Sequence, residues 1–334
     1  LSGEPAIAFE HVSFSYAHAT SARKRRRKLL GRHAIPAQPG ELAVQDLTFA
    51  VRAGSLTALV GRTGSGKSTT VELTCALKVP LTGAVRIAGI DTADLSHRRE
   101  LRHLVGYVSQ LPERQLFAET VGEDVAFGPR NLHLAEDEVA ARTREALASV
   151  GLPTDDGFLS RSPFALSGGQ QRGVALAGVL AMRPRVLVLD EPMAGLDPAG
   201  RAQTRALLAR LKREGTTLLL VTHDMDDVAE LADHMIVLDE GRLAAEGAPA
   251  EVFPASRVIS PAASDSPASR GASPAAAGPS NTGAGPLAAV GLPSALAFAR
   301  SLEARGVSPL GDPLTLDALA RALVGEATAH GAAR

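Results

Sequence analysis

A chain of 334 residues with 45% hydrophobic and 3% aromatic side chains can bury a sizeable core, which aliphatic residues and alanine must fill because tryptophan is absent. The formal net charge of −1 excludes a general electrostatic attraction to nucleic acid. The single cysteine, Cys75, excludes an internal disulfide and is typical of a reducing compartment. No signal-peptide pattern opens the chain, and the uncharged run 271–299 contains too much Gly, Pro and Ser for a membrane span. The sequence therefore predicts a cytoplasmic protein.

Alternating strand and helix patterns follow in chain order. An apolar–polar alternation predicts an edge strand over Ile7–Tyr16. Further strands are expected at Leu47–Val51, Leu56–Val60, Val85–Ile87, Val105–Val108, Val186–Asp190, Leu218–Thr222, Met235–Leu238 and Arg242–Ala245. Helices are expected at Ser68–Leu77, Ala135–Val150, Gly168–Met182 and Ala199–Arg213, and the first of them carries Leu73, Ala76 and Leu77 on one face. This alternation predicts an α/β fold in which helices cover both faces of a parallel sheet.

The composition changes after residue 253. Residues 254–290 are dominated by Ala, Ser, Pro and Gly, which cannot bury enough apolar surface to order a segment, so a flexible linker is predicted. Helical periodicity returns at Pro293–Arg305, and Thr315 is placed to cap a second helix. The apolar residues of that second helix are Leu316, Leu319 and Leu323. Two helices of this size are too small to fold alone, so we expect them to dock on another surface.

A glycine-rich loop joins a predicted strand to a predicted helix at residues 61–68, Gly-Arg-Thr-Gly-Ser-Gly-Lys-Ser. Its glycines allow the backbone N–H groups to surround phosphates, at the positive end of the following helix. The sequence predicts that Lys67 reaches the β- and γ-phosphates of ATP and that the Ser68 hydroxyl binds Mg²⁺. The nucleotide contacts expected here are Gly61, Arg62, Thr63, Gly64, Ser65, Gly66, Lys67, Ser68 and Thr69.

Polar side chains follow two predicted central strands at their carboxyl ends. Asp190 ends an apolar strand, so its carboxylate should emerge beside the phosphate loop and bind Mg²⁺, usually through water. Glu191 follows and can deprotonate or orient the attacking water. His223 comes after the next strand, where it can contact the γ-phosphate and hold Glu191 in place. Lys67, Glu191 and His223 are therefore predicted catalytic residues.

A second glycine-rich motif, Leu-Ser-Gly-Gly-Gln-Gln at residues 166–171, opens a predicted helix. Together with the phosphate loop and the Asp190–Glu191 pair, it resembles the ATP-binding cassette (ABC) ATPases. The resemblance implies a P-loop ABC ATPase domain over residues 5–253, with a mixed sheet, an antiparallel β subdomain and a helical subdomain at about 111–166. A small helical extension, 291–334, would follow it.

The same resemblance implies roles for residues outside the phosphate loop. ABC ATPases close ATP between two subunits, so the second motif would cap the γ-phosphate held by the opposite subunit; its contacts would be Ser167, Gly168, Gly169 and Gln170. Gln110 would contact Mg²⁺ and the attacking water, and Asp197 would lie in the loop that communicates across the dimer. Tyr16 could stack on adenine; the alternative is a half-buried strand aromatic.

Residues 111–121 and 124–129 resemble more narrowly the A component, or ATPase, of energy-coupling factor (ECF) transporters, which import vitamins and transition-metal ions. That resemblance implies a second A component or a copy of this chain, a transmembrane T component and a substrate-binding S component. A coupling helix of the T component would dock between Gln110 and Phe127, which places the chain peripherally on the cytoplasmic face of the membrane. The helices in 291–334 would contribute to pairing of the two ATPases.

Other interpretations remain open. The chain could serve another ABC importer, for amino acids or metals, or act as a soluble ABC protein on nucleic acid; a single phosphate loop and no long heptad run argue against the latter, so no nucleic-acid partner is expected. Gly173 and Met193 depart from the family pattern. The basic run Arg23–Lys28 could meet anionic lipid or nucleic acid, but the absence of interleaved aromatic residues favours a solvated loop.

Overall fold

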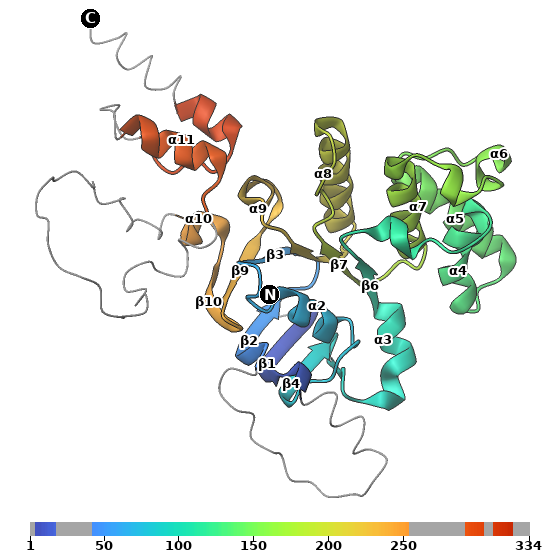
Figure 1. Ribbon diagram of the computed structural model, residues 1–334, viewed down its shortest axis with the longest axis horizontal. Coiled ribbons are helices and arrows are strands. Elements are labelled where there is room, and N and C mark those ends of the chain that lie inside the picture. The colour runs from blue at the N-terminus through green and yellow to red at the C-terminus, as the bar shows by residue number, and fades with distance from the viewer. Residues whose placement is uncertain (1–3, 18–41, 254–290, 304–309, 323–334) are drawn as a thin grey trace, which may run out of the picture.

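The computed structural model describes residues 4–17, 42–253, 291–303 and 310–322. Two β-sheets occupy the middle of the molecule, a helical bundle lies at one end and the carboxy-terminal helices lie at the other (Figure 1). The predicted linker 254–290 and the basic run 23–28 fall outside the described residues.

The smaller sheet is antiparallel, with the strand order β2-β1-β4-β5. Its strands are β1 (Ile7–Phe14), β2 (Val44–Val51), β4 (Thr82–Ile87) and β5 (Ile90–Asp91). The prediction of an edge strand was wrong, because β1 pairs with β2 on one side and β4 on the other. An apolar–polar alternation reports only that one face of a strand is buried, and it says nothing about how many neighbours the strand has.

The larger sheet is mixed, with the order β10-β9-β3-β8-β7-β6. Its strands are β3 (Leu56–Gly61), β6 (Val105–Val108), β7 (Val186–Asp190), β8 (Thr217–Val221), β9 (His234–Asp239) and β10 (Arg242–Gly247). All neighbouring strands run parallel except β10, which returns antiparallel to β9. The carboxyl ends of β3, β8, β7 and β6 consequently meet along one edge of the sheet, where ligands bind in parallel sheets of this kind.

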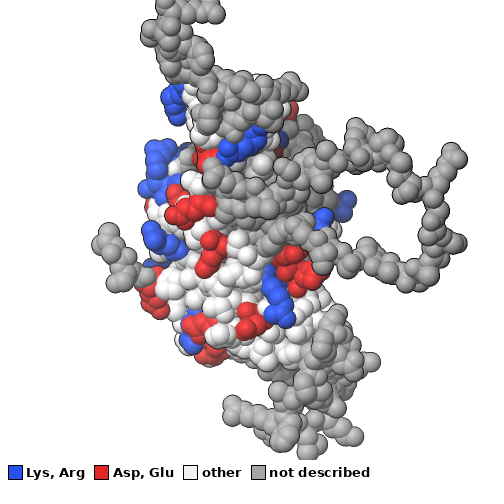
Figure 2. Space-filling model, turned by 90° about the vertical axis from the view of Figure 1, so that its left-hand side faces the viewer, with Lys and Arg blue, Asp and Glu red and all other residues white. Residues whose placement is uncertain are grey.

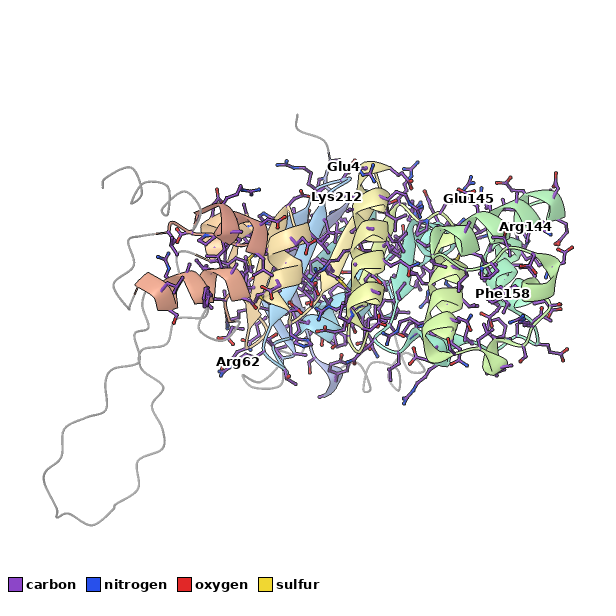
Figure 3. The ribbon with its side chains drawn as sticks, turned by 90° about the horizontal axis from the view of Figure 1, so that it is seen from above. Glu4, Arg62, Arg144, Glu145, Phe158 and Lys212 are labelled. Atoms are coloured by element: carbon purple, nitrogen blue, oxygen red, sulfur yellow. The ribbon has the colours of Figure 1, made fainter. Side chains whose placement is uncertain are left out.

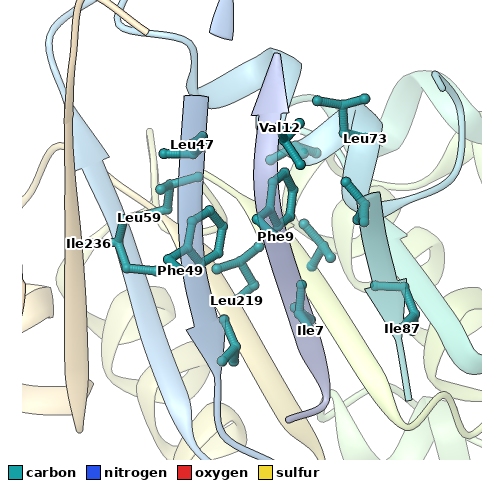
Figure 4. Close-up of a cluster of buried hydrophobic side chains, with 14 of the residues drawn as sticks. Ile7, Phe9, Val12, Leu47, Phe49, Leu59, Leu73, Ile87, Leu219 and Ile236 are labelled. Carbon is teal, nitrogen blue, oxygen red and sulfur yellow. The ribbon is translucent and has the colours of Figure 1, made fainter. Parts of the chain in front are cut away.

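An apolar core fills the space between the two sheets (Figure 4). Phe9 of the small sheet stacks on Phe49, with ring centroids 4.5 Å apart, and the large sheet contributes Leu59, Leu219 and Ile236. The other face of the large sheet packs against α8 (Pro198–Arg213). The central strands are thus buried on both faces, and each fully buried leucine adds about 1.5–3 kcal/mol to the drive for folding. This packing fixes the edge on which the functional side chains lie.

Helix α2 (Lys67–Thr74), which follows the glycine-rich loop, is shorter than predicted. Val71 and Leu73 are buried in the core between the sheets. The chain turns at Ala76, whose φ is +52°, so Leu77 lies outside the helix with 59% exposure and does not share the face of Leu73 as predicted. The apolar periodicity continued past the point where the backbone leaves the helix.

The helical bundle comprises α4 (Val121–Asn131), α5 (Glu136–Ser149), α6 (Asp156–Leu159) and α7 (Gly168–Leu180). Val125, Leu147 and Val174 meet in its core, so α7 belongs to the bundle although it begins beyond residue 166. Seen from above, the bundle and the carboxy-terminal helices lie at opposite ends of the molecule (Figure 3). Helix α3 (Arg98–Leu104) connects the small sheet to β6.

The carboxy-terminal helices pack against α9 (Met225–Leu231) and α10 (Pro249–Val252). They are α11 (Ser294–Glu303) and a short helix over 316–322, at whose start the Thr315 hydroxyl accepts a hydrogen bond from the Ala318 N–H at 3.2 Å, as predicted. Leu319 is buried, but Leu316 is 70% exposed, because only one side of this short helix meets α11. Acidic and basic side chains are interspersed on this end of the molecule (Figure 2).

Candidate functional site

The glycine-rich loop leaves the end of β3 and leads directly into α2. Gly61 has a φ of +152°, and a Cβ atom there would lie 2.3 Å from the Leu238 carbonyl oxygen. No side chain fits at this position, so the loop backbone passes tightly against β9. The loop therefore has the strand-before, helix-after setting that a phosphate cradle requires.

Lys67 spans the inside of the loop. Its ammonium donates hydrogen bonds to the carbonyl oxygens of Gly61 at 2.6 Å and Arg62 at 2.8 Å. Burial lowers the pKa of Lys67, while the nearby Glu191 and Asp190 carboxylates act in the opposite direction. The ammonium is thus held beside two carboxylates, at the place where phosphate oxygens would enter.

Asp190 ends β7, and Glu191 follows it at the same edge. Burial raises the pKa of the Asp190 carboxyl, and the neighbouring Glu191 adds to this, while Lys67 opposes it. Glu191 has a φ of +52°, and its N–H donates to the Val221 carbonyl at 2.9 Å. A non-glycine residue held in this region costs about 1–3 kcal/mol, which the surrounding strands must offset to keep the Glu191 carboxylate in place.

His223 contacts Glu191 directly. The His223 Nδ1 atom lies 2.7 Å from the Glu191 Oε1 atom, and the carboxylate side chain is only 14% exposed whereas the histidine is 77% exposed. The structure therefore brings together two side chains that lie 32 residues apart in the sequence, with the imidazole on the open side of the carboxylate.

A cleft of about 1110 Å³ joins these elements; we call it the phosphate-loop cleft. The predicted site residues that line it are Tyr16, Gly61, Arg62, Thr63, Gly64, Gly66, Lys67, Ser68, Thr69, Gln110, Asp190, Glu191 and His223. Ser65 does not line the cleft, because its side chain is buried behind the loop. Ala43 and Met225 do line it, although no motif marked them in the sequence.

Tyr16 lies just beyond the end of β1, and its hydroxyl is fixed to α2. The hydroxyl lies 3.1 Å from Thr69 Oγ1 and 2.7 Å from Glu72 Oε2. The Lys78 ammonium lies 5.5 Å from the centroid of the ring. These contacts orient the aromatic ring at the border of the phosphate-loop cleft, in a position suited to stacking against a base.

The Ser-Gly-Gly-Gln motif lies in a different place. Ser167 caps α7 by accepting a hydrogen bond from the Gln170 N–H at 3.4 Å, and the Gln170 side chain accepts one from the Ser167 N–H at 3.2 Å. Asp197 caps α8 by accepting a hydrogen bond from the Gly200 N–H at 2.7 Å. Both caps line a separate cavity of about 720 Å³ between the bundle and α8, the signature cavity. The predicted contacts thus divide between two cavities of one chain.

The two departures from the family pattern have local explanations. Gly173 lies against Leu152, whose Cδ1 atom would be 3.0 Å from an added Cβ, so the glycine gives α7 room to pack. Met193 is 4% exposed and joins the apolar cluster under α8. Neither residue lines the phosphate-loop cleft.

A phosphate cradle, an acidic pair with a histidine partner, and a separate Ser-Gly-Gly-Gln helix start together define an ATPase of the ABC class. A family model described as ABC transporter matches residues 44–194. Among solved structures, cbiO1 from Clostridium perfringens, part of the ABC transporter complex cbiONQ, is similar with a TM-score of 0.63 and 33% identity, covering 75% of this chain and 92% of that one. A dimeric ATP-binding cassette in a post-hydrolysis state, bound to ADP and Pi, is similar with a TM-score of 0.58 and 26% identity, covering 73% and 98%.

Curated relatives narrow the class. Energy-coupling factor transporter ATP-binding protein EcfA2 of Lactiplantibacillus plantarum is 42% identical over 338 residues, which cover 97% of this chain and 99% of the relative. The protein of the same name from Symbiobacterium thermophilum is 44% identical over 284 residues, covering 85% and 89%. The chain belongs to the family of energy-coupling factor transporter ATP-binding proteins.

The predictions of fold class, family and enzyme class are thereby confirmed: the chain is an ABC-type ATPase of the ECF group, and it binds ATP. These EcfA2 relatives favour the ECF group over an ATPase of another importer class and over a nucleic-acid ABC protein. Within the described part of the chain, no helix has both the length and the apolar character that crossing a membrane demands.

Proposed function

We propose that this chain is the A component of an ECF-type importer and hydrolyses ATP as one half of an ATPase pair. The separation of the phosphate-loop cleft from the signature cavity carries the proposal. One chain presents a cradle on one surface and a cap on another, so a second subunit is needed to complete each nucleotide site. A dimeric ABC relative bound to ADP and Pi supports the same arrangement.

The glycines of the cap support this pairing. Gly168 and Gly169 are exposed, and a Cβ atom added at either position would meet no described atom within 4 Å beyond its chain neighbours and the backbone of α7. Their own subunit therefore does not require glycine there. A phosphate from the opposite subunit, approaching the first N–H groups of α7, supplies a reason for residues without side chains.

We assign a separate role in ATP binding and hydrolysis to each of these side chains. Lys67 would exchange its carbonyl partners for phosphate oxygens and hold the β- and γ-phosphates. The Glu191 carboxylate would accept the proton of the attacking water, and His223 would keep that carboxylate in position. Tyr16 would orient the base, and Asp197 would contact the second subunit.

Magnesium fits the remaining donors. Ser68, Gln110 and Asp190 place oxygen atoms on the same cleft, and oxygen is the ligand type that Mg²⁺ prefers. The described residues contain no group of three or more His, Cys, Asp or Glu side chains that could hold a metal alone. The cation would therefore share its coordination with the nucleotide and water, and it would neutralise charge on the phosphates.

A membrane partner would bind at a groove of about 940 Å³ between α3, α4 and α7, where apolar side chains of α4 and α7 face Arg98, Arg99 and Arg102 of α3. Phe117 and Phe127 line it with 59% and 50% exposure, and their rings meet edge to face with centroids 4.8 Å apart. The Asp124 carboxylate at the base is already bonded to the Phe117 and Ala118 N–H groups at 2.9 and 3.0 Å. The exposed apolar side chains of this groove suit a helix of the T component, with the S component supplying the vitamin or metal ion. The chain would then lie on the cytoplasmic face of the membrane.

Trapping the nucleotide tests the pairing. In Glu191→Gln, we expect ATP binding to remain while turnover falls by about 10²–10⁴-fold, because the proton acceptor is lost. With ATP and Mg²⁺, light scattering after size exclusion should then show two ATPase subunits enclosing the nucleotide. Normal hydrolysis by this variant, or a monomer that retains ATP unaided, contradicts the proposal.

A further inference from the structure

Helix α9 begins directly behind the histidine of the site. His223 is followed by Asp224, which caps the helix by accepting a hydrogen bond from the Asp226 N–H at 3.0 Å. One residue therefore joins the first turn of α9 to His223. His223 in turn contacts Glu191 at 2.7 Å, so the start of α9 lies directly beside the pair.

Two arginines of α8 hold this turn from one side. Asp227 is 1% exposed, and it accepts hydrogen bonds from Arg201 Nη2 at 3.0 Å and Arg205 Nε at 2.8 Å. Arg201 also bonds to Asp224. A buried carboxylate with this number of charged donors has little freedom, so α8 and α9 form a rigid pair at this point.

The carboxy-terminal extension, residues 291–322, holds the same turn from the other side. Both oxygen atoms of Asp226 accept hydrogen bonds from Ser294, Oδ1 from its N–H at 2.6 Å and Oδ2 from its hydroxyl at 2.7 Å. The carboxylate thus acts as the cap of α11, although it belongs to another helix. The two helices lie side by side in Figures 1 and 3.

An apolar contact accompanies this cap. Leu296 of α11 is 1% exposed and shares a buried cluster with Met225, Val228 and Phe253. Met225 also lines the phosphate-loop cleft. The extension therefore packs into the same layer of side chains that forms one wall of the nucleotide site.

We propose that the carboxy-terminal extension is a positioning element for hydrolysis in its own subunit. Ser294 and Asp226 are the positioning residues: their contact completes the clamp on the first turn of α9 and keeps His223 against Glu191. The inference rests on the catalytic role proposed for His223 and Glu191. It is separate from pairing, because the contact lies within one chain.

Point variants in the full chain, within the purified complex, test this. We expect Asp226→Ala to lower kcat about three- to tenfold and leave KM for ATP within about twofold, because nucleotide contacts are retained while the pair is misplaced. Ser294→Ala should lower kcat less, since its N–H still donates, and Ser294→Thr should restore it. Asp317→Ala makes the same chemical change at an exposed position of the extension and should have no effect.

A double-mutant cycle tests whether Asp226 affects hydrolysis through His223. In a His223→Ala background, measured by single-turnover hydrolysis, Asp226→Ala should add no further loss. Additive losses, an unchanged kcat in Asp226→Ala, or an equal loss in Asp317→Ala would overturn the inference. The inference would also be overturned if the kcat of Asp226→Ala returned to the wild-type value at a higher protein concentration at which light scattering shows restored pairing. Normal turnover by His223→Ala alone would instead contradict the proposed function itself.

Discussion

Lys67 shows how one side chain can be poised for an anion. Its ammonium bonds to two loop carbonyls in a partly buried site between two carboxylates. Lys67→Ala should weaken ATP binding about 10- to 100-fold, since a hydrogen bond to a charged group contributes about 1.5–3 kcal/mol. Fluorescent-nucleotide titration measures this. The control is Lys212→Ala, which removes an ammonium that is paired with Asp233 and does not line the cleft. An unchanged ATP affinity in Lys67→Ala would count against the phosphate cradle.

The partly buried Asp190 carboxylate, which we expect to bind Mg²⁺, should lower the free energy of unfolding at neutral pH. Its pKa is raised in the folded protein, mainly by burial, so the folded state binds this proton more tightly than the unfolded state. The free energy of unfolding therefore falls as pH rises from the ordinary Asp value, about 3.9, through the raised folded value. Asp190→Asn lacks this loss, so without nucleotide it should melt at a higher temperature than the wild type at pH 7.5.

Calorimetry across pH checks this prediction. The difference between Asp190→Asn and the wild type should shrink as pH falls through the raised folded pKa, and it should vanish below about 3.9, where the wild-type carboxyl is protonated in both states. Asp137→Asn, at an exposed carboxyl of α5, serves as the control. A difference that stays constant with pH would show that packing, not the charge, is responsible.

At the scale of elements, the groove beside α4 has a test of its own. Phe127→Asp places a charge where an apolar helix should bind, so co-purification with a co-expressed T component should drop at least tenfold. ATP binding by the isolated chain should not change, because the residue is outside the phosphate-loop cleft. Val79→Asp, at another exposed apolar position, should co-purify normally. Equal recovery of both variants would exclude the groove as the docking surface.

Elements also show what sequence patterns could and could not predict. The phosphate loop, Asp190 and His223 were predictable because each sits where a buried strand ends, and parallel strands bring those ends together. The central position of β1 was not predictable, because it depends on pairing with β4, which lies far away in the sequence. The Asp226–Ser294 contact was not predictable either, since it joins residues 68 positions apart with no motif to mark them.

For the whole molecule, the extension provides a pairing test. Phe298 is 52% exposed and Leu316 is 70% exposed, whereas Leu296, Ala299 and Leu319 of the same two helices are buried. Deleting residues 291–334 should weaken ATPase pairing about tenfold or more while ATP still binds to the cleft. Sedimentation equilibrium measures the change. Phe298→Ser removes exposed apolar surface without uncovering α9, so this variant should show a smaller loss of pairing than the deletion. Equal pairing by the truncated chain and the wild type would refute this role.

The placement of cradle and cap in separate cavities has a genetic consequence. If two copies of this chain pair, a subunit lacking Lys67 harms the site it cradles, whereas one altered at Gly169 harms the site of its mate. In a mixed pair of these two subunits, the altered cradle and the altered cap meet at the same site. The other site combines an intact cradle with an intact cap. Two alleles that each abolish transport alone should therefore complement each other when expressed together.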